Sequence, residues 1–250
     1  MIELRGVSKT YGGQTVLHPL DLSLAPRRTT VLIGPSGCGK STLLRLIIGL
    51  VRPDAGSVAI DGHVVTPDSV LQVRRELGYV TQDGGLFPHL SARRNVELVA
   101  QFLGWERPRI DERVAVLAEL TRFPPDALDR FPAQLSGGQK QRASLMRALM
   151  LDPRVILLDE PMGALDPMVR AELQTDLRAI FRSLEKTVIL VTHDLAEAAW
   201  FGDEILLMRD GRIIQRGMLR QLIDEPAESF VTRFVSAQRR VVEPGGGGDS

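Results

Sequence analysis

The sequence has almost no cysteine, and it has no excess of either charge. Among its 250 residues Cys38 is the only cysteine, which excludes an internal disulfide and a zinc site built from several cysteines. We therefore expect a reducing compartment. Lys and Arg number 31 and so do Asp and Glu, which gives a formal net charge of zero. We expect no nucleic-acid partner, because the overall basic charge typical of such proteins is missing and only a local basic patch is left open.

Long apolar runs are missing as well. The longest apolar stretch, residues 43–51, contains Arg45 and is far shorter than the roughly 20 residues that a membrane-spanning helix needs. Near the start of the chain, Glu3 and Arg5 interrupt the apolar segment that a signal peptide requires. If the protein works at a membrane, we expect a partner to supply the membrane segment.

Short apolar runs alternate with amphipathic segments along the chain. Residues 29–33, 155–158 and 187–191 are rich in apolar and β-branched side chains, which predicts strands buried on both faces. Helical patterns follow at 41–49 and at 167–184. This alternation predicts an α/β protein with a mostly parallel sheet.

The remaining segments predict hairpins and a block of helices. Residues 2–24 and 57–65 contain glycine turns between alternating apolar positions, which is typical of hairpins. Residues 91–150 have a helical pattern that interrupts the strands, so we expect an inserted helical subdomain there. The other expected elements are a strand at 77–81, a hairpin at 204–208 and 212–215, helix starts at Ser91, Asp111, Pro125-Asp126 and Ser136, and helices near 218–223 and 228–235.

The strongest motif lies between the strand at 29–33 and the helix after it. It matches G-x-x-x-x-G-K-[ST], in which glycines let the backbone curl and point N–H groups at phosphates. The positive end of the following helix adds to this attraction. Lys40 is expected to neutralise the β- and γ-phosphates, and the Ser41 hydroxyl to ligate Mg²⁺. The candidate nucleotide-binding residues here are Gly34, Pro35, Ser36, Gly37, Cys38, Gly39, Lys40, Ser41 and Thr42.

Two further features bear on this phosphate loop. Cys38 fills a free position of the motif, either as a small spacer or as a redox switch.

The strand at 155–158 delivers Asp159 and Glu160 to its carboxyl end, where ligands bind in open α/β sheets. Asp159 is expected to hold Mg²⁺, and Glu160 to polarise the attacking water. An Asp-Glu pair after a strand can be a simple turn, but beside a phosphate loop it predicts a catalytic pair.

A second motif indicates the family. Leu135-Ser136-Gly137-Gly138-Gln139 matches the LSGGQ signature, and with it the chain resembles the ATP-binding-cassette (ABC) ATPases. The resemblance implies a P-loop NTPase (RecA-like) core with a mostly parallel sheet, an N-terminal antiparallel β subdomain and an inserted helical subdomain. It covers about residues 2–238, with the helical subdomain at about 91–150, and leaves 239–250 as a flexible C-terminal tail.

The resemblance also assigns roles to single residues. Tyr11 takes the position of the aromatic that stacks on adenine, although a hairpin aromatic can also simply pack. Gln82 matches the Q-loop glutamine and Ala164-Leu165-Asp166 the D-loop, while His193 matches the switch histidine, unless it is only a partly buried imidazole. The implied catalytic residues are Glu160, His193 and Lys40; the implied Mg²⁺ ligands are Ser41, Gln82 and Asp159; and Ser136, Gly137, Gly138 and Gln139 bind nucleotide as well.

The resemblance further implies a composite site. Two chains, identical in the simplest case, would pack head to tail with two ATP molecules between them. Residues 136–138 of one chain would then contact the nucleotide held by the other. ATP would close this dimer and hydrolysis would let it open.

Missing features narrow the type of cassette. The sequence has no heptad arrays or zinc cysteines, which chromosome and repair relatives carry, and it has neither a second cassette nor fused membrane spans. We therefore expect an importer ATPase on the cytoplasmic face of the membrane. Its partners would be separate permease subunits and, indirectly, an extracytoplasmic solute-binding protein. Leu86, Phe87 and Leu90 predict an apolar surface for the permease, unless these side chains pack internally.

The transported solute is indicated only by family resemblance. Residues 82–89, 160–167 and 224–231 are similar to the ATPases of glycine betaine/choline importers, which take up osmoprotectants. Cassettes for amino acids, methionine, sulfonates or lipids share most of these motifs and stay open as alternatives. A soluble ATPase that remodels a protein or nucleic acid without transport is a second class of function.

Overall fold

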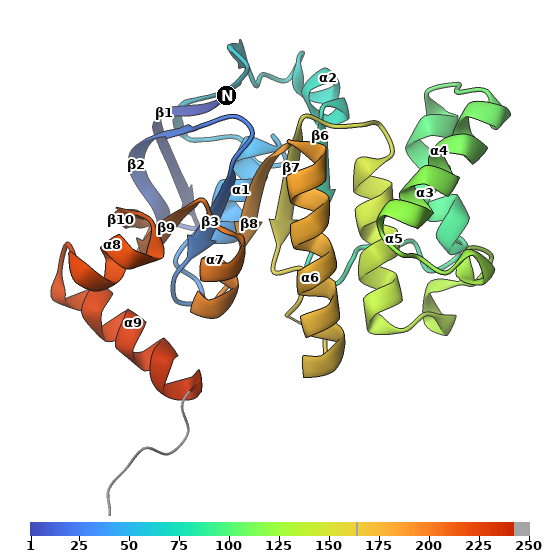
Figure 1. The fold of residues 1–250 in the computed structure, drawn as a ribbon. Coiled ribbons are helices and arrows are strands. Elements are labelled where there is room, and N and C mark those ends of the chain that lie inside the picture. The colour runs from blue at the N-terminus through green and yellow to red at the C-terminus, as the bar shows by residue number, and fades with distance from the viewer. Residues whose placement is uncertain (164, 243–250) are drawn as a thin grey trace, which may run out of the picture.

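A computed structural model describes residues 1–163 and 165–242, and its strands form two sheets (Figure 1). The smaller sheet is antiparallel and has the order β2-β1-β4-β5. The larger has the order β10-β9-β3-β8-β7-β6 and is parallel except for the β10–β9 pair. The strands are β1 (Ile2–Tyr11), β2 (Gln14–Leu24), β3 (Thr29–Ile33), β4 (Ala55–Ile60), β5 (His63–Val64), β6 (Leu77–Val80), β7 (Val155–Asp159), β8 (Thr187–Val191), β9 (Glu204–Arg209) and β10 (Arg212–Gly217).

Helices fill the space between and beside these sheets. They are α1 (Lys40–Ile47), α2 (Val70–Arg75), α3 (Ala92–Phe102), α4 (Arg107–Leu120), α5 (Gly137–Leu149), α6 (Pro167–Leu184), α7 (Leu195–Phe201), α8 (Leu219–Asp224) and α9 (Ser229–Val242). Short 3₁₀ turns span Pro125–Ala127 and Pro132–Gln134. The predicted fold class, a mostly parallel α/β core with an antiparallel β subdomain, is confirmed.

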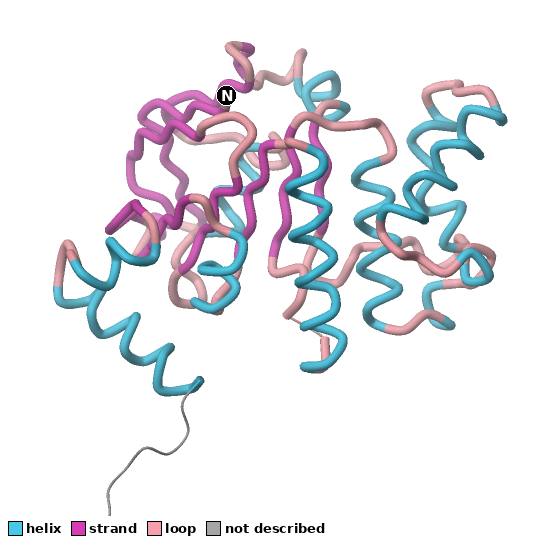
Figure 2. The backbone as a smooth tube through the Cα atoms, in the orientation of Figure 1, coloured by secondary structure: helices cyan, strands magenta, loops and turns pink. Residues whose placement is uncertain are grey.

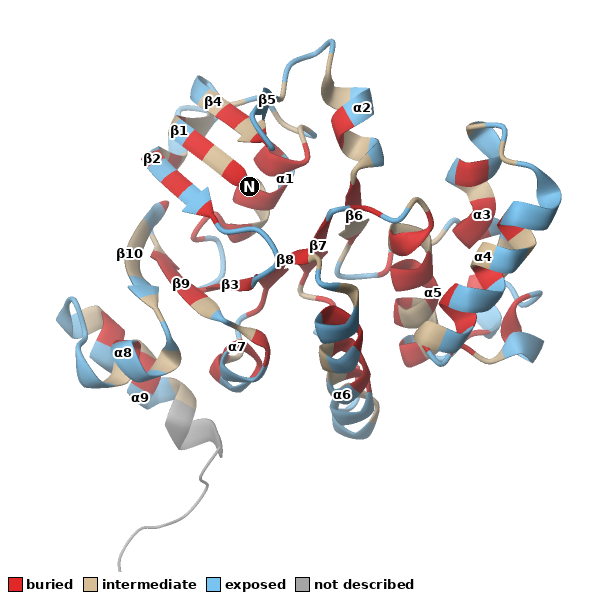
Figure 3. Cartoon of the chain, turned by 45° about the horizontal axis from the view of Figure 1, so that its top comes forward, coloured by how far each residue is buried: buried red, intermediate tan, exposed pale blue. Residues whose placement is uncertain are grey.

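Two hydrophobic cores lie on the two faces of the large sheet. Helix α1 lies between the sheets, so Leu32 of β3 packs in one core with α1 and the small sheet. The neighbours of Leu32 along the strand, Val31 and Ile33, point to the other face and pack with α6 and α7. Figure 3 shows buried residues gathering where α1 meets the sheets. Because both faces are covered, every residue of β3, β7 and β8 is buried.

The helices α3, α4 and α5 form a block beside the edge strand β6 (Figure 2). Ser91 and Ser136 cap α3 and α5, as expected. The expected start at Asp111 was wrong, because α4 begins at Arg107 with a proline in its first turn, the place where proline fits a helix. Asp111 instead forms ion pairs with Arg93 and Arg107.

The sequence did not predict α2. Helix α9 runs to Val242, so its backbone includes 239–242, which the sequence assigned to the tail. Residues 243–250, with the glycine run of that tail, lie outside the described residues. Among the helices of the described chain, none has both the length and the apolar character needed to cross a membrane.

Candidate functional site

Four predicted site segments meet at the carboxyl edge of the large sheet. Strands β3, β8, β7 and β6 are neighbours in that order. The phosphate loop follows β3, Asp159 ends β7, and His193 and Gln82 each stand two residues beyond β8 and β6. Parallel strands bring their carboxyl ends to one edge, where α/β proteins bind ligands. The topology thus gathers residues that are far apart in the sequence.

The loop has its shape because of its glycines. Gly34 and Gly39 have φ angles of 148° and 106°, which L side chains rarely adopt. A Cβ at Gly34 would lie 2.1 Å from the Met208 carbonyl oxygen, and one at Gly39 would lie 2.7 Å from Leu17 Cδ2. Neither position can accept a side chain without a shift of its surroundings. The motif glycines are therefore required by both backbone conformation and packing.

Lys40 is buried inside the loop that it completes. Only 5% of it is exposed, and its Nζ donates to the carbonyl oxygens of Gly34 at 2.8 Å and Pro35 at 3.0 Å. Its charge is held at the entrance of α1, where the helix end adds a positive potential. The loop lines a cavity of about 290 Å³ together with Val16, Thr42 and Glu160. Lys40 and the N-terminus of α1 supply the positive charge that would bind phosphates in this cavity.

The single cysteine of the loop is buried next to this lysine. The Cys38 Sγ lies 3.9 Å from Lys40 Nζ. Burial raises the pKa of the Cys38 thiol, although Lys40 opposes this. A buried, protonated thiol reacts slowly with oxidants. The geometry favours the small-spacer interpretation of Cys38 over a redox switch.

Ser41 and Asp159 form the candidate metal-binding pair. The Ser41 Oγ donates to Asp159 Oδ1 at 2.9 Å, across 118 positions of sequence. Tyr79 of β6 donates its hydroxyl to Asp159 Oδ2 at 3.4 Å. Burial raises the pKa of the Asp159 carboxyl, while Ser41 and the charge of Arg45 oppose that rise. Sequence analysis missed Tyr79 and Arg45, which no motif marks.

Glu160 and His193 form the second pair of this edge. Glu160 has a φ of 47°, unusual for a residue with a side chain, and its N–H donates to the Val191 carbonyl at 3.0 Å. Its Oε2 lies 3.2 Å from His193 Nδ1. A Cβ placed at Gly163 would lie 3.6 Å from Glu160 Oε2 and 3.7 Å from Gln82 Nε2. Gln82, Glu160 and His193 are therefore close neighbours.

A buried glutamate holds the segment around His193. The Thr192 hydroxyl donates to Glu197 Oε2, and Asp194 caps α7 by accepting from the backbone N–H groups of Ala196 and Glu197. Burial raises the pKa of the Glu197 carboxyl, and the Thr192 hydrogen bond opposes this. Glu197 was not predicted. A carboxylate one turn into a helix that follows a site histidine is the signal that could have indicated it.

The signature segment lies apart from the phosphate loop of its own chain. Ser136 caps α5, accepting from the Gln139 N–H, while the Gln139 side chain accepts from the Ser136 N–H. Ser136 and Gly137 are exposed and Gly138 is buried. None of these residues lines the loop cavity.

The signature glycines instead face the first turn of α6 and the segment just before it. A Cβ at Gly137 would lie 2.9 Å from Leu165 Cδ2, and one at Gly138 would lie 2.7 Å from Val169 Cγ1. Asp166, from the predicted D-loop, caps α6. Ala164 of the same predicted loop lies outside the described residues. The signature and the D-loop thus pack together at the start of α5 and α6.

Tyr11, predicted to stack on adenine, also does not line the loop cavity. It is 44% exposed at the end of β1, and Lys9 Nζ lies 5.3 Å from its ring centroid. An exposed ring leaves room for stacking. The contact with a base stays a prediction.

The oxygen donors fit Mg²⁺ in combination with a nucleotide. Among the residues that the structure describes, no three His, Cys, Asp or Glu side chains cluster tightly enough to hold a metal alone. Ser41 and Asp159 offer a hydroxyl and a carboxylate, and Mg²⁺ in phosphate sites is held by few protein oxygens plus the phosphates. The donor set therefore suits an ion that arrives with a phosphate ligand.

Fold and site together define a P-loop nucleotide-binding protein of the α/β class, built as a cassette with a helical block. The profile of the family described as "ABC transporter" matches residues 17–163. The chain is 40% identical over 242 residues to the glycine betaine/carnitine/choline transport ATP-binding protein OpuCA of Bacillus subtilis, covering 96% of this chain and 64% of that protein. It is 43% identical over 234 residues to the glycine betaine uptake system ATP-binding protein YehX of Escherichia coli, covering 94% of this chain and 76% of the relative.

Solved structures agree with the sequence relatives. The dimeric ATP-binding cassette MJ0796, in a post-hydrolysis state bound to ADP and Pi, superposes with a TM-score of 0.80 at 32% identity, covering 88% of this chain and 99% of that one. This chain therefore belongs to the ABC transporter family. The chain spans 64% of the length of OpuCA.

Proposed function

We propose that this chain is the ATP-binding and ATP-hydrolysing subunit of an ABC importer. The observation that carries the proposal is the meeting of Lys40, Asp159, Glu160 and His193 at one sheet edge around the loop cavity. Those side chains supply charge neutralisation, metal binding and water activation, which are the components of phosphoryl transfer to water. Catalysis would come from positioning and electrostatic stabilisation, without a covalent intermediate.

The phosphate loop would bind ATP with its backbone N–H groups and Lys40. The Lys40 ammonium would exchange its two carbonyl acceptors, on Gly34 and Pro35, for stronger charge-assisted hydrogen bonds to phosphate oxygens. Ser41 and Asp159, with Gln82, would hold the Mg²⁺. The ion, when bound, neutralises charge that develops on the phosphates.

Glu160 would polarise the attacking water. Its backbone is fixed by the hydrogen bond to Val191, and its carboxylate is kept in place by His193 at 3.2 Å. His193 is largely exposed, so it is also able to contact the γ-phosphate and support its transition-state charge. A base with a fixed backbone and an oriented carboxylate is what proton abstraction requires.

A second copy of the chain would complete the site. Ser136 and Gly137 are exposed at the N-terminus of α5, where a helix can bind an anion. Neither residue lines the phosphate-loop cavity of its own chain. In a head-to-tail pair, each signature segment would close over the nucleotide of the other chain. The dimeric cassette MJ0796 supports this arrangement by its fold similarity.

The face beside Gln82 would dock the permease at the cytoplasmic side of the membrane. Phe87 is 44% exposed, and Asn95 holds its backbone through the Phe87 N–H at 2.7 Å and carbonyl at 3.1 Å. Leu86 packs on the core, which fits the internal-packing alternative, while Phe87 and the intermediate Leu90 offer apolar surface. A fixed, exposed aromatic is the kind of anchor that interfaces use. An extracytoplasmic solute-binding protein would take part indirectly.

The solute would be a quaternary amine such as glycine betaine or choline, as the similarity to OpuCA and YehX supports. The cassette does not contact the solute, so importers for amino acids, methionine, sulfonates or lipids are the alternative. In liposomes with the permease and binding protein, betaine or choline should stimulate ATP hydrolysis. Absence of stimulation by betaine, choline and carnitine would exclude this solute class, and hydrolysis unaffected by any permease would favour a soluble ATPase.

A further inference from the structure

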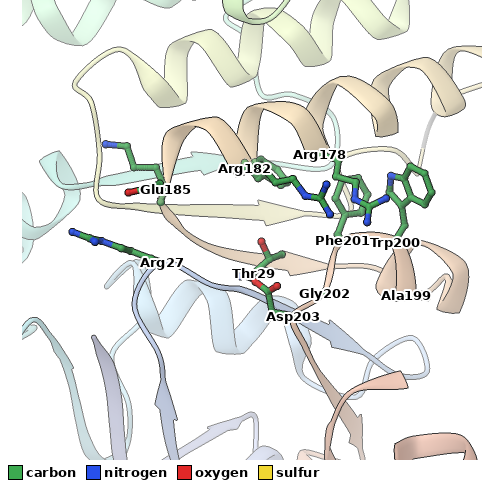
Figure 4. Close-up of a pocket in the computed structure, with 12 residues that line it drawn as sticks. Arg27, Thr29, Arg178, Arg182, Glu185, Ala199, Trp200, Phe201, Gly202 and Asp203 are labelled. Carbon is green, nitrogen blue, oxygen red and sulfur yellow. Dashed lines mark hydrogen bonds between the residues drawn. The ribbon is translucent and has the colours of Figure 1, made fainter. Parts of the chain in front are cut away.

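A second cavity opens at the amino-terminal ends of the parallel strands, on the opposite side of the large sheet from the phosphate loop. It has a volume of about 380 Å³ and lies where β3, β8 and β9 begin, beside the carboxyl-terminal halves of α6 and α7. The rings of Phe181 and Phe201 pack at 5.8 Å between centroids and form its apolar wall. Figure 4 shows Arg178 and Arg182 extending from α6 beside Trp200 and Phe201, with Thr29 and Asp203 across from them.

Unpaired positive charge gathers around this cavity. Lys186 forms an ion pair with Asp152 at 3.0 Å. In the part of the chain that the structure describes, Arg27, Arg178 and Arg182 form no ion pair with any carboxylate. The lining carboxylate of Asp203 already accepts the Thr29 N–H at 2.8 Å. The four lining cations, Arg27, Arg178, Arg182 and Lys186, outnumber the two lining carboxylates, Glu185 and Asp203, and this excess of positive charge raises the local potential for an anionic ligand.

An exposed aromatic adds a second kind of contact. Trp200 is 44% exposed, and the Arg178 guanidinium lies 4.2 Å from its ring centroid. A stacked arginine and tryptophan form a planar surface on which a flat ring can pack. The planar guanidinium group of arginine can also donate two parallel hydrogen bonds to phosphate oxygens. The cavity volume falls in the range of small-molecule pockets, roughly 300–1,000 Å³.

We propose that this cavity binds a small organic phosphate with a planar ring, of the nucleoside monophosphate class. Arg182 holds the phosphate, and the ring packs beside Trp200 and Arg178. The site is separate from the phosphate loop, which lies at the other edge of the same sheet. Helices α6 and α7 start beside the D-loop and His193, so a ligand at their far ends contacts the same two helices that carry those segments.

Arg178 and Arg182 have one other structural explanation. They lie in the last two turns of α6, where a cation stabilises the helix dipole. That role predicts a loss of stability when the charge is reversed, but no saturable ligand binding. Binding and stability therefore need separate measurements on the same variants.

Fluorescence of Trp200 tests the proposal directly. The chain has two tryptophans, Trp105 and Trp200, so Trp105→Phe leaves a single reporter in the cavity. Combining it with Lys40→Ala removes nucleotide binding at the phosphate loop. Titration of this full-length double variant with AMP should give a saturable change in Trp200 emission. Inorganic phosphate should bind about tenfold more weakly, because it lacks the ring contacts.

Charge reversal supplies the matched comparison. Arg182→Glu should weaken AMP binding at least about tenfold, since it removes a charge-assisted contact. Arg75→Glu, an exposed arginine in the last turn of α2, should leave binding unchanged. Thermal unfolding of each variant checks that it is folded. No saturable change with AMP, equal affinity for phosphate and AMP, or an unchanged affinity in a folded Arg182→Glu chain would each overturn the proposal.

Discussion

The phosphate loop and the signature segment use the same physical feature, a helix N-terminus, in opposite ways. Lys40 is 5% exposed and its loop is tied to Asp159 through Ser41, so the loop is completed by its own chain. Ser136 and Gly137 are exposed, and their hydrogen bonds are satisfied within a local capping box. The difference agrees with our proposal that one half of the site is preorganised within the single chain, whereas the other half contacts the nucleotide held by a second chain.

Asp159 and Glu160 extend the comparison to neighbouring carboxylates. Asp159 is buried and bound by Ser41 and Tyr79, while Glu160 turns out of the sheet through its positive φ. One backbone step thus separates the proposed metal-binding position from the proposed water-activating position.

The largest effect is expected from Glu160→Gln. The amide keeps the shape of the side chain but cannot accept a proton, so ATP turnover should fall about a thousandfold while ATP binding stays near that of the parent. Steady-state hydrolysis and equilibrium nucleotide binding measure the two quantities. Glu172→Gln, an exposed change on α6, serves as control. Hydrolysis at the parent rate would remove the role assigned to Glu160.

Ser136→Glu tests whether the signature segment and the phosphate loop contribute separately to the nucleotide site. An acidic residue is tolerated at a helix N-terminus, but it would repel the phosphates of a nucleotide held by a second chain. Turnover should fall about a hundredfold with unchanged ATP affinity of the single chain. Lys40→Ala should instead abolish that affinity. If Ser136→Glu weakened ATP binding as Lys40→Ala does, the two halves would not be separate.

Phe87→Ala tests the proposed permease-docking surface, which includes neither the phosphate loop nor the signature segment. Truncating an exposed anchor should weaken co-purification with the permease about tenfold, while hydrolysis by the isolated chain persists. Phe102→Ala is the matched control, because Phe102 is 84% exposed on the same helical block. Equal recovery of the permease with Phe87→Ala and the parent would count against docking at Phe87.

The smallest effect is expected from Glu197→Gln. Burial raises the pKa of Glu197 above its ordinary value of 4.5, so the folded state holds this proton more tightly than the unfolded chain. Stability of the parent should therefore decline as the pH rises from 4.5 through the raised pKa, and the variant should show a flatter decline. Denaturant titrations across this pH range measure it. Identical pH profiles of the parent and the variant would show that Glu197 does not contribute to the pH dependence of stability.

The sequence predicted those parts of the site that are local in the chain. The loop at 34–41 is a contiguous motif between a strand and a helix, so its glycines and Lys40 could be identified without tertiary structure. The family resemblance supplied Gln82 and His193. Strand boundaries such as 187–191 matched the structure, because buried parallel strands are continuous apolar runs.

Contacts between distant segments could not be predicted in this way. Tyr79 reaches Asp159 only because β6 and β7 are neighbours in the sheet, and its sequence position carries no motif. Asp111 looked like a helix cap, yet its partners Arg93 and Arg107 draw it into an ion-pair network. Cap preferences are local, whereas the choice of partner depends on packing. The separation of the signature from its own loop was implied by the family resemblance and not by any local pattern.

In the proposed dimer, the loop of one chain holds a nucleotide and the signature of a second chain closes over it. Molecular mass in solution tests this most directly, using Glu160→Gln to prevent turnover, with ATP and Mg²⁺ present. We predict that this variant doubles its mass on ATP addition. The Glu160→Gln/Ser136→Glu double variant should bind ATP with the same affinity and stay monomeric. Doubling of the mass in the double variant would contradict closure of the dimer by the signature segment.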